Sequence, residues 1–418
     1  MNVLVMTLGS HGDVHPFLGI ASSLKARGHT VKFFANVYYE SLVRAIGVEF
    51  VPIGTAAEFE AVARDPKTWH WFAGFKRIGK SIGSAIRPYY QAVLEHAVAG
   101  QTVLVYSTLC FGTRLAQETL RLPGVSVHLS PAVFFSSHAP PVIRGMYMPA
   151  WLPRGLKRAL FGLTDKLTLQ RIFGRPVNAF RAELNLPPVR SVMGEWCHSP
   201  QRVIGLFPDW YAPPQSDWPP QTVLTGFPLW DEQQVTPISP QLEEFLNSGS
   251  PPIAFTPGSA MFHGQKFFSA AIDACQRMNR RGLLLTRHAE QIPADLPASV
   301  LHIPFAPFGP LLPRCAAVVH HGGIGSTAQG LAAGIPQLLM PMSFDQPDNA
   351  QRVKNLGVGD WLGPRRFTGG NVSAALGRLI GSHNVAAACR SVAEKFAGSA
   401  PLIQTARYIE QVEGKIGL

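Results

Sequence analysis

Apolar runs of strand length alternate with segments of helical period along this chain, and this alternation limits its fold more than any other feature. The series begins at Val3 and starts again near Pro252 after an interruption. Strands that alternate with helices form parallel sheets with helices packed on both faces. The sequence therefore predicts an α/β protein with two Rossmann-like halves. The predicted strands are residues 3–8, 30–35, 103–106, 125–129, 253–256, 283–286, 301–303 and 315–319, and the predicted helices are residues 17–26, 111–120, 267–278 and 326–333.

Proline-rich segments separate the two series. Prolines are dense at 212–220 and again at 236–240, which is typical of a linker between domains. A chain of 418 residues is long enough for two domains with separate cores. We therefore expect two α/β domains that face each other across a cleft. The predicted boundaries are 1–215 for the N-terminal domain, 216–240 for the linker, 241–400 for the C-terminal domain and 401–418 for a C-terminal helix.

Charge and cysteine content narrow the function classes. The net charge of +11 and the pI near 9.6 fit either a merely basic enzyme or one attracted to anionic substrates or an anionic membrane surface. No zinc-finger spacing or RNA-binding motif supports a nucleic-acid partner. The five cysteines form no CxxC pair, which suits a reducing compartment and argues against a disulfide framework or a structural zinc site.

The N-terminus and the hydropathy pattern bear on location. Residues 1–6 lack a basic leader and read as a first core strand. No uncharged apolar stretch reaches the roughly 20 residues that span a bilayer. We therefore expect a cytoplasmic protein, with peripheral contact at the inner face of the membrane as an option.

Two basic segments have two possible interpretations. Residues 144–181 are helical in pattern and basic, and residues 76–80 follow a group of aromatic residues. Each is either a solvated helix face or part of an acceptor pocket with a basic rim toward a membrane. Gly74–Ser81 also fits the P-loop pattern, but its variable positions are bulky for a loop that must fold around phosphate. We predict an acceptor-side loop there.

A glycine-rich turn follows the predicted strand 315–319 and opens the predicted helix 326–333. Unpaired backbone N–H groups and the positive end of a helix dipole meet at such a turn, so it binds phosphate. Gly323 and Gly325 also fit the dinucleotide fingerprint, with Asp345 about 20 residues further on for a ribose. An NAD-dependent oxidoreductase is therefore one alternative. Ser259, which follows the predicted strand 253–256, is a second candidate ligand of the diphosphate.

The surrounding residues resemble a different signature. Phe305-Ala306-Pro307, the segment from His321 to Thr327, and Asp345-Gln346 are together similar to the donor site of the GT-B nucleotide-sugar glycosyltransferases, which include plant secondary-product, sterol and antibiotic enzymes. The resemblance implies that the backbone around Phe305 frames the base. It further implies that the last helix crosses back to the N-terminal domain, which would bind the acceptor while the C-terminal domain binds the nucleotide sugar. The phosphate ligands would be His321, Gly323, Gly325, Ser326 and Thr327, and the sugar ligands Asp345 and Gln346.

The first predicted strand leads into Gly9-Ser10-His11-Gly12-Asp13. A carboxylate near a helix start is favoured in any case, but glycosyl transfer to an alcohol also needs a base. The block resembles the Gly-Ser-x-Gly-Asp-Val of antibiotic and sterol glycosyltransferases, which implies that Asp13 is the catalytic base. His11 and His15 are neighbours that could tune it. Residues 106–108 lack the carboxylate that the plant enzymes place after the fourth strand, so a His–Asp relay is not expected.

The donor is left open by the sequence. Segments 195–201, 206–214 and 225–229 look like those of the rhamnosyltransferases of bacterial rhamnolipid synthesis, which implies a dTDP-rhamnose donor and a hydroxylated fatty-acid acceptor. Residues 326–329 are closer to the sterol type, so UDP-glucose remains a rival. No Asp-x-Asp motif occurs, and we expect neither a metal nor a cofactor beyond the nucleotide sugar.

The prediction is therefore an inverting, metal-independent hexosyltransferase that acts on a hydrophobic hydroxylated acceptor. Besides the oxidoreductase, one other alternative is a non-catalytic GT-B helper that binds nucleotide sugar and a partner enzyme. A helper would not need a base at Asp13.

Overall fold

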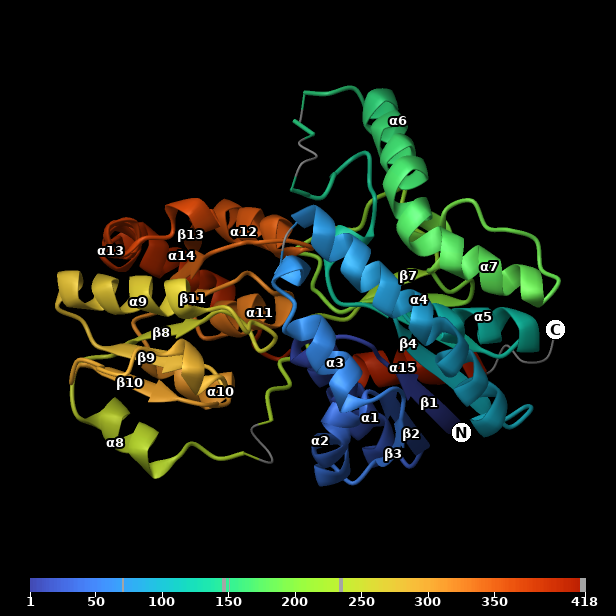
Figure 1. Ribbon diagram of the computed structural model, residues 1–418, viewed down its shortest axis with the longest axis horizontal. Coiled ribbons are helices and arrows are strands. Elements are labelled where there is room, and N and C mark those ends of the chain that lie inside the picture. The colour runs from blue at the N-terminus through green and yellow to red at the C-terminus, as the bar shows by residue number, and fades with distance from the viewer. Residues whose placement is uncertain (70, 145–147, 150, 233–235, 414–418) are drawn as a thin grey trace. The chain divides into compact units, whose positions relative to one another are not determined.

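The computed structural model describes residues 1–69, 71–144, 148–149, 151–232 and 236–413. The described residues divide into two compact units, one formed by Met1–Thr68, Phe72–Pro228 and the chain from Ala400, the other by Trp69–Trp71 and Leu229–Ser399. Each unit is built around one parallel sheet (Figure 1). The alternation in the sequence thus predicted the architecture of both halves.

The sheet of the first unit has the strand order β3-β2-β1-β4-β5-β6-β7, with every neighbouring pair parallel. The order reverses between β1 and β4, so this unit has a topological switch point there. The strands are β1 (Asn2–Met6), β2 (Thr30–Ala35), β3 (Glu49–Pro52), β4 (Thr102–Ser107), β5 (Gly124–His128), β6 (Arg202–Gly205) and β7 (Thr222–Leu224).

Helices cover both faces of this sheet. Helices α4, α5 and α7 pack on one face, where Leu4 and Tyr106 of the sheet meet Ile86, Phe111 and Phe180. Helices α1 and α15 lie on the other face. The α-helices are α1 (His11–Ala26), α2 (Glu40–Ala45), α3 (Ala56–Ala63), α4 (Trp71–His96), α5 (Phe111–Leu120), α6 (Arg154–Thr164), α7 (Arg175–Glu183) and α15 (Pro401–Glu413), and the short or π-type helices are η1 (Val37–Tyr39), η2 (Pro66–Trp69), η3 (Pro131–Val133), η4 (Asp165–Gly174) and η5 (Val192–Trp196).

The sheet of the second unit has the order β10-β9-β8-β11-β12-β13, again all parallel. The switch point lies between β8 and β11. The strands are β8 (Ile253–Thr256), β9 (Gly282–Leu285), β10 (Val300–Ile303), β11 (Ala317–His320), β12 (Gln337–Leu339) and β13 (Gly359–Trp361).

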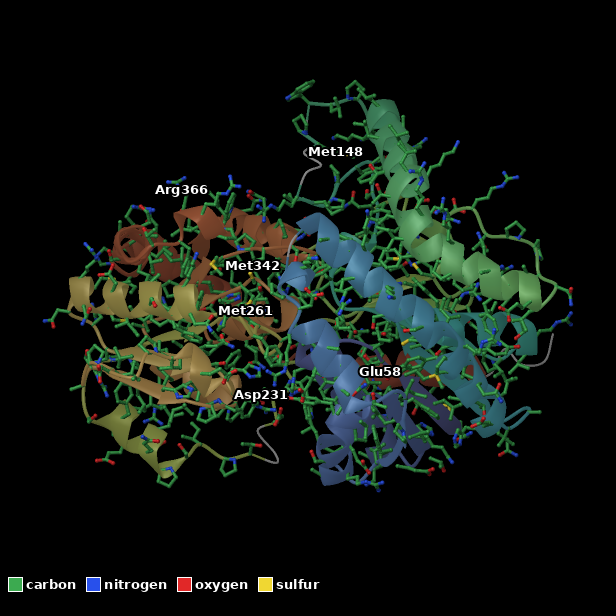
Figure 2. All side chains as sticks on the ribbon, in the orientation of Figure 1. Glu58, Met148, Asp231, Met261, Met342 and Arg366 are labelled. Carbon is green, nitrogen blue, oxygen red and sulfur yellow. The ribbon has the colours of Figure 1, made fainter. Side chains whose placement is uncertain are left out.

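Two apolar cores sandwich this second sheet. Helices α9 and α13 cover one face, and α8 and α10 the other. Met261 and Met342, which Figure 2 labels, belong to the first core and anchor the loops that follow β8 and β12. The helices are α8 (Pro240–Asn247), α9 (Gln265–Met278), η6 (Ala289–Gln291), α10 (Phe308–Leu311), η7 (Leu312–Arg314), α11 (Ile324–Ala332), α12 (Gln346–Asn355), η8 (Pro364–Arg366), α13 (Gly369–Ile380) and α14 (His383–Glu394).

The segment predicted as a linker is partly built into the first unit. Residues 222–224 form the edge strand β7, so the predicted start of the linker at 216 is wrong. Asp217 also binds this unit, because Ser136 and Ser137 donate three hydrogen bonds of 2.6–2.9 Å to its carboxylate. The pattern was read as a linker because prolines mark an edge strand and a linker alike.

The C-terminal helix α15 packs against α1, β4 and β5 of the first unit. Its Glu410 accepts hydrogen bonds from Arg27 at 2.6 and 2.7 Å and contacts His29 at 2.7 Å. Thr405 bonds the hydroxyl of Thr225 at 2.8 Å. These contacts tie the end of the chain to the first unit.

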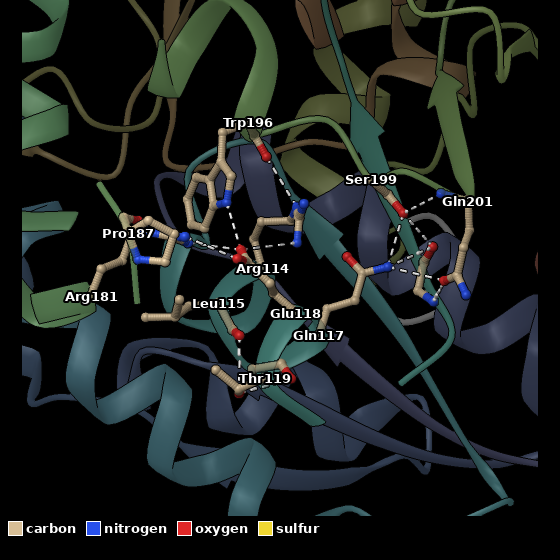
Figure 3. Close-up of polar contacts among 12 residues, drawn as sticks. Arg114, Leu115, Gln117, Glu118, Thr119, Arg181, Pro187, Trp196, Ser199 and Gln201 are labelled. Carbon is tan, nitrogen blue, oxygen red and sulfur yellow. Dashed lines mark hydrogen bonds and ion pairs between the residues drawn. The ribbon is translucent and has the colours of Figure 1, made fainter. Parts of the chain in front are cut away.

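A partly buried ionic network fixes α5 to α7 and η5 (Figure 3). Arg181 donates to both oxygens of Glu118 at 2.8 and 3.0 Å, and the indole of Trp196 donates to the same carboxylate at 2.8 Å. Arg114 donates to the Trp196 carbonyl at 3.0 Å. Burial alone would raise the pKa of Glu118, but the hydrogen bonds from Arg181 and Trp196 outweigh it and hold that pKa below its ordinary value.

The P-loop pattern at Gly74–Ser81 does not form a loop. These residues lie inside α4, where backbone N–H groups are used within the helix. The expected acceptor-side loop is therefore wrong. The basic segment 144–181 is helical from Arg154 onward, in α6, η4 and α7, while residues 145–147 and 150 lie outside the described residues. In the part of the chain that is described, each helix is too short or too polar to cross a membrane.

Candidate active site

The switch point of the second sheet brings two loops together. β8 and β11 are parallel neighbours, and Thr256 pairs with His320 at their carboxyl ends. The loop with Gly258 and Ser259 follows β8, and the glycine-rich turn follows β11. Ligands of open α/β sheets bind at this position, so the fold places the predicted phosphate turn where a ligand site is expected.

His321 occupies the space between these two loops. A Cβ atom on Gly258 would lie 2.7 Å from Cε1 of the His321 ring, and one on Gly323 would lie 2.5 Å from Nε2. Gly258 also has a φ of +100°, a conformation that glycine alone adopts easily. Burial, with a smaller contribution from His320, lowers the pKa of His321 to about 3, so its imidazole is neutral at physiological pH.

The Nδ1 atom of His321 is buried and has no hydrogen-bond partner among the described residues. A buried polar atom without a partner costs free energy, and a ligand group that bonds it would recover that cost. The orphaned nitrogen therefore makes this point a candidate ligand contact. A neutral imidazole can supply an N–H to a phosphate oxygen here.

His320, by contrast, is fully engaged inside the protein. It bonds the Gln337 side chain at 2.9 Å through Nε2, and its Nδ1 accepts the Gly322 N–H at 3.1 Å. Alternation along a strand predicted that His320 points away from the site. Its contacts confirm that it shapes the glycine turn from within.

Helix α11 opens directly after His321, with Gly323 as its N-cap residue. The N–H groups of its first turn have no acceptor within the helix, and Gly325 is exposed beside the half-buried Ser326. Thr327 was predicted as a phosphate ligand, but its side chain is already used within the protein. It is buried, and its hydroxyl bonds the Gly323 carbonyl at 3.0 Å.

Asp345 is the N-cap residue of helix α12 and Gln346 is its first residue, and both side chains are hydrogen-bonded within the protein. The Gln346 side chain is buried, and its Oε1 accepts the N–H groups of Met342 at 2.8 Å and Ser343 at 3.2 Å. Asn349 donates to the Asp345 carboxylate and to the Gly322 carbonyl, both at 2.9 Å. Asn349 thus links the predicted sugar ligand to the glycine turn.

Phe305 and Ser259 lie on separate loops of the second unit. The guanidinium of Arg287 lies 4.8 Å from the centre of the half-buried Phe305 ring, and Ser259 is exposed. Gln329 is buried, and its Nε2 donates to the Leu229 carbonyl at 3.1 Å. Sequence reasoning missed Asn349 and Arg287, because neither belongs to a local motif.

In the first unit, Asp13 lies in the first turn of α1, at the switch point between β1 and β4. Its Oδ2 accepts the Ser10 N–H at 2.7 Å and the Ser10 hydroxyl at 3.1 Å. The carboxylate fills the space that a side chain on Gly9 would occupy, and Gly9 has a φ of +136°. Desolvation raises the pKa of Asp13 and outweighs the two hydrogen bonds from Ser10, which lower it.

The predicted neighbours of Asp13 lie on the same helix. The buried His11 ring makes edge contacts with His15, Tyr38 and Tyr39, with ring centres 5.1–5.6 Å apart. The raised pKa of the buried Asp13 carboxyl suits a general base.

A pair of histidines, one at the end of β5 and the other just before β6, was not predicted. Thr108, just after β4, bonds Nδ1 of His128 at 2.7 Å, and Nε2 of His128 bonds Nδ1 of His198 at 2.9 Å. Burial lowers the pKa of both rings, that of His198 to about 4. Seventy residues separate the two histidines, so no spacing in the sequence could have indicated their contact.

Known protein families match both units. The Glycosyltransferase family 28 N-terminal domain matches residues 3–135, and the Erythromycin biosynthesis protein CIII-like, C-terminal domain matches residues 282–407. O-mycaminosyltylonolide 6-deoxyallosyltransferase of Streptomyces fradiae is 33% identical over 379 residues, which is 86% of this chain and 84% of that protein. The chain is a GT-B glycosyltransferase.

Other glycosyltransferases are also similar to this chain in sequence or in fold. Vancomycin aglycone glucosyltransferase of Amycolatopsis orientalis is 28% identical over 86% of this chain and 85% of its own. The solved structure of the glycotransferase of kitacinnamycin shares the fold with a TM-score of 0.74 and 20% identity, over 98% of each chain. The spinosyn rhamnosyltransferase SpnG complexed with thymidine diphosphate has a TM-score of 0.67 and 16% identity, over 98% of this chain and 100% of that one.

The oxidoreductase alternative is wrong for this glycosyltransferase. Its glycine turn follows the fourth strand of the second sheet in chain order, whereas a dinucleotide fingerprint follows the first. Asp345 also lies beyond the end of β12, at the start of α12. The match to the glycine pattern therefore does not identify a dinucleotide site.

Proposed function

We propose that this glycosyltransferase moves a hexose from a nucleotide diphosphate sugar to a hydroxyl group of a hydrophobic acceptor, with inversion at the anomeric carbon. The observation that carries the proposal is the buried Nδ1 of His321, which lacks a partner among the described residues at the opening of α11. A diphosphate oxygen would satisfy that atom together with the first-turn N–H groups of the helix.

The donor ligands are assigned by position within the second unit. His321, Ser259 and the backbone of residues 323–327 would hold the diphosphate, with Thr327 contributing through the backbone because its hydroxyl is already bonded. Asp345 and Gln346 would orient the sugar, and the backbone at Phe305 would frame the base. For Gln346, the buried Oε1 is used within its loop, which leaves the amide N–H groups for the sugar.

Asp13 would serve as the base, with His11 as a neighbour that tunes it. The acceptor O–H proton moves to the Asp13 carboxylate as the acceptor oxygen bonds the anomeric carbon. The bond from that carbon to the diphosphate oxygen breaks, and the nucleotide diphosphate leaves with the electron pair. Helix amides and His321 would stabilise the leaving charge, so the proposal includes neither a metal nor a further cofactor.

The sugar and the acceptor are proposed as classes. A dTDP-rhamnose donor is supported by the fold shared with a rhamnosyltransferase that is complexed with thymidine diphosphate. A UDP-glucose donor is supported by glucosyltransferase relatives, among them sterol 3-beta-glucosyltransferase UGT80B1 of Arabidopsis thaliana at 26% identity. The relatives named for sterol, vancomycin aglycone and tylonolide acceptors favour a bulky hydroxylated natural product or lipid.

We place the reaction in the cytoplasm, with peripheral contact at the inner face of an anionic membrane. All five cysteines are free and buried, as expected in a reducing compartment. A positive net charge favours an anionic surface, and a hydrophobic acceptor would be found there.

A thermal-shift panel tests donor binding. UDP, dTDP, UDP-glucose, dTDP-rhamnose and NAD are added separately to the full chain, because a ligand that binds only the native state raises its melting temperature. We expect stabilisation by one nucleotide series and its loss in His321→Ala. Stabilisation by NAD alone, or an undiminished response in His321→Ala, would overturn the proposed donor site.

A further inference from the structure

A row of leucines is exposed on the helical arm formed by α6 and η4. Leu156, Leu163 and Leu167 are exposed by 48%, 53% and 45% of their surfaces, and Trp151 just before the arm by 80%. The leucines are spaced by seven and four residues, which puts them on one side of the helix. Figure 1 shows α6 projecting away from the sheet of its own unit. Apolar side chains aligned in this way usually face a partner or a membrane.

A basic groove lies beside this row, between α4 on one side and η4 with α7 on the other. Its volume is about 670 Å³, and four of its lining residues are Lys76, Lys80, Arg171 and Arg175. Leu167 lines the groove as well, so the leucine row and the basic groove form one continuous surface. No carboxylate lines the groove among the described residues.

Three of the groove's cations are not neutralised by a carboxylate of the described residues. In the part of the chain that is described, Lys80, Arg171 and Arg175 form no ion pair, whereas nearby Arg87 pairs with Glu183. Several like charges held around one groove repel each other unless an anion enters. The groove therefore favours a ligand with a phosphate group.

We propose that this surface docks on a membrane of anionic phospholipid. The leucine row and Trp151 enter the interfacial layer, and Lys80, Arg171 and Arg175 hold a lipid phosphate in the groove. Tryptophan favours the membrane interface, and a helix with one apolar side beside a cluster of cations is typical of proteins that lie in that plane. The inference rests on the proposed membrane contact and not on the proposed reaction.

Charge decides between lipid and a second copy of this chain. A symmetric dimer through the leucine row would place the same basic groove of each copy near the other, and like charges would oppose it. A membrane with negative headgroups offers the opposite charge together with an apolar layer. The observations therefore favour lipid.

Vesicle co-sedimentation tests the docking surface with the full chain and no donor. We expect binding to phosphatidylcholine vesicles that contain phosphatidylglycerol, weaker binding at high salt, and little binding to phosphatidylcholine alone. Arg171→Gln with Arg175→Gln should weaken binding roughly tenfold or more. Leu156→Ser with Leu163→Ser should also weaken it, and this loss should persist at low salt.

A matched control removes the same charge elsewhere. Arg378→Gln with Arg407→Gln changes two exposed arginines outside the groove and should keep nearly all binding. Equal loss in this control would show general charge attraction and overturn the site. A dimer in light scattering that the leucine variant dissociates, without vesicle binding, would overturn it in favour of self-association. The rise in melting temperature with nucleotide reports the donor site separately, so failure of either proposal is visible without the other.

Discussion

The His321 imidazole lies against the α-carbon of Gly258, so that a Cβ atom there would stand 2.7 Å from its Cε1. The two residues follow neighbouring parallel strands and are brought together at their carboxyl ends. Gly258 therefore determines the position of the ring that carries the orphaned Nδ1. We therefore expect the proposed donor site to depend on this contact as much as on the glycine turn.

Gly258→Ala should displace the His321 ring. The new methyl group meets the ring, and the backbone at φ +100° disfavours any side chain, so we expect a loss of about 1–3 kcal/mol in the free energy of unfolding. Nucleotide affinity should fall roughly tenfold, an estimate based on one lost hydrogen bond to a charged group. Isothermal titration calorimetry measures the nucleotide affinity, and urea unfolding measures the stability. In the control Gly370→Ala, the Cβ atom meets no described atom within 4 Å, and both quantities should stay near wild type.

Asp13→Asn should lower kcat by about 10²- to 10⁴-fold, the usual contribution of a general base. The asparagine oxygen can still accept the Ser10 N–H, so the helix start is kept. Because burial raises the pKa of Asp13, the ionised carboxylate destabilises the fold at neutral pH, and the variant should melt no lower than wild type. Turnover at the wild-type rate would rule out Asp13 as the base.

Ser10→Ala should shift the acidic limb of the rate profile. A base must be deprotonated, so kcat/KM falls as pH drops through the pKa of Asp13, which is raised above 3.8. The Ser10 hydroxyl stabilises the ionised form, so its removal should move this limb to higher pH. Ser10→Thr, which keeps a hydroxyl, should leave the limb in place. If the acidic limb stays in place in both variants, a group other than Asp13 is responsible for it.

Buried histidines should make the protein sensitive to acid. The pKa values of His198, His320 and His321 are lowered to about 4, 4 and 3, and that of His128 lies well below 6.5. Below pH 6.5 the unfolded chain binds protons that the folded chain does not, so stability falls as pH drops from 6.5 toward 4. The slope is at most about 1.4 kcal/mol per pH unit per histidine. Urea unfolding between pH 7 and 5 measures it, and a flat profile would contradict the burial argument.

Glu410→Gln should loosen the C-terminal helix. Hydrogen bonds from Arg27 lower the pKa of Glu410 to about 2, so this carboxylate stabilises the fold above pH 4.5 and loses that effect as pH falls toward 2. At neutral pH the variant should lose about 0.5–1 kcal/mol, and exchange of the α15 amides should speed up. Arg407→Gln on the exposed side of the same helix is the matched control. Equal effects in both variants would contradict a specific contact.

Strong periodic segments could be predicted to the residue. The bounds of β2, α5 and β8 agree with the predicted 30–35, 111–120 and 253–256, because sharp changes of composition flank each apolar pattern. Segments that proline or glycine interrupts were harder to interpret. Gly74–Ser81 was expected to form a loop, yet tertiary packing against the first core holds it within α4.

The sequence by itself determined that the chain alternates strands with helices twice, that a phosphate turn follows one strand, and that a carboxylate follows another. These are local properties, set by side-chain periodicity and by what glycine permits. Only the tertiary structure decided which distant residues meet: Gly258 with His321, Asn349 with Asp345 and Gly322, and Thr108 with the His128–His198 pair. The order of strands in a parallel sheet sets these contacts, because it places loops far apart in the chain at one edge. Burial at this edge is also the main cause of the shifted pKa values of Asp13, His128, His198 and His321.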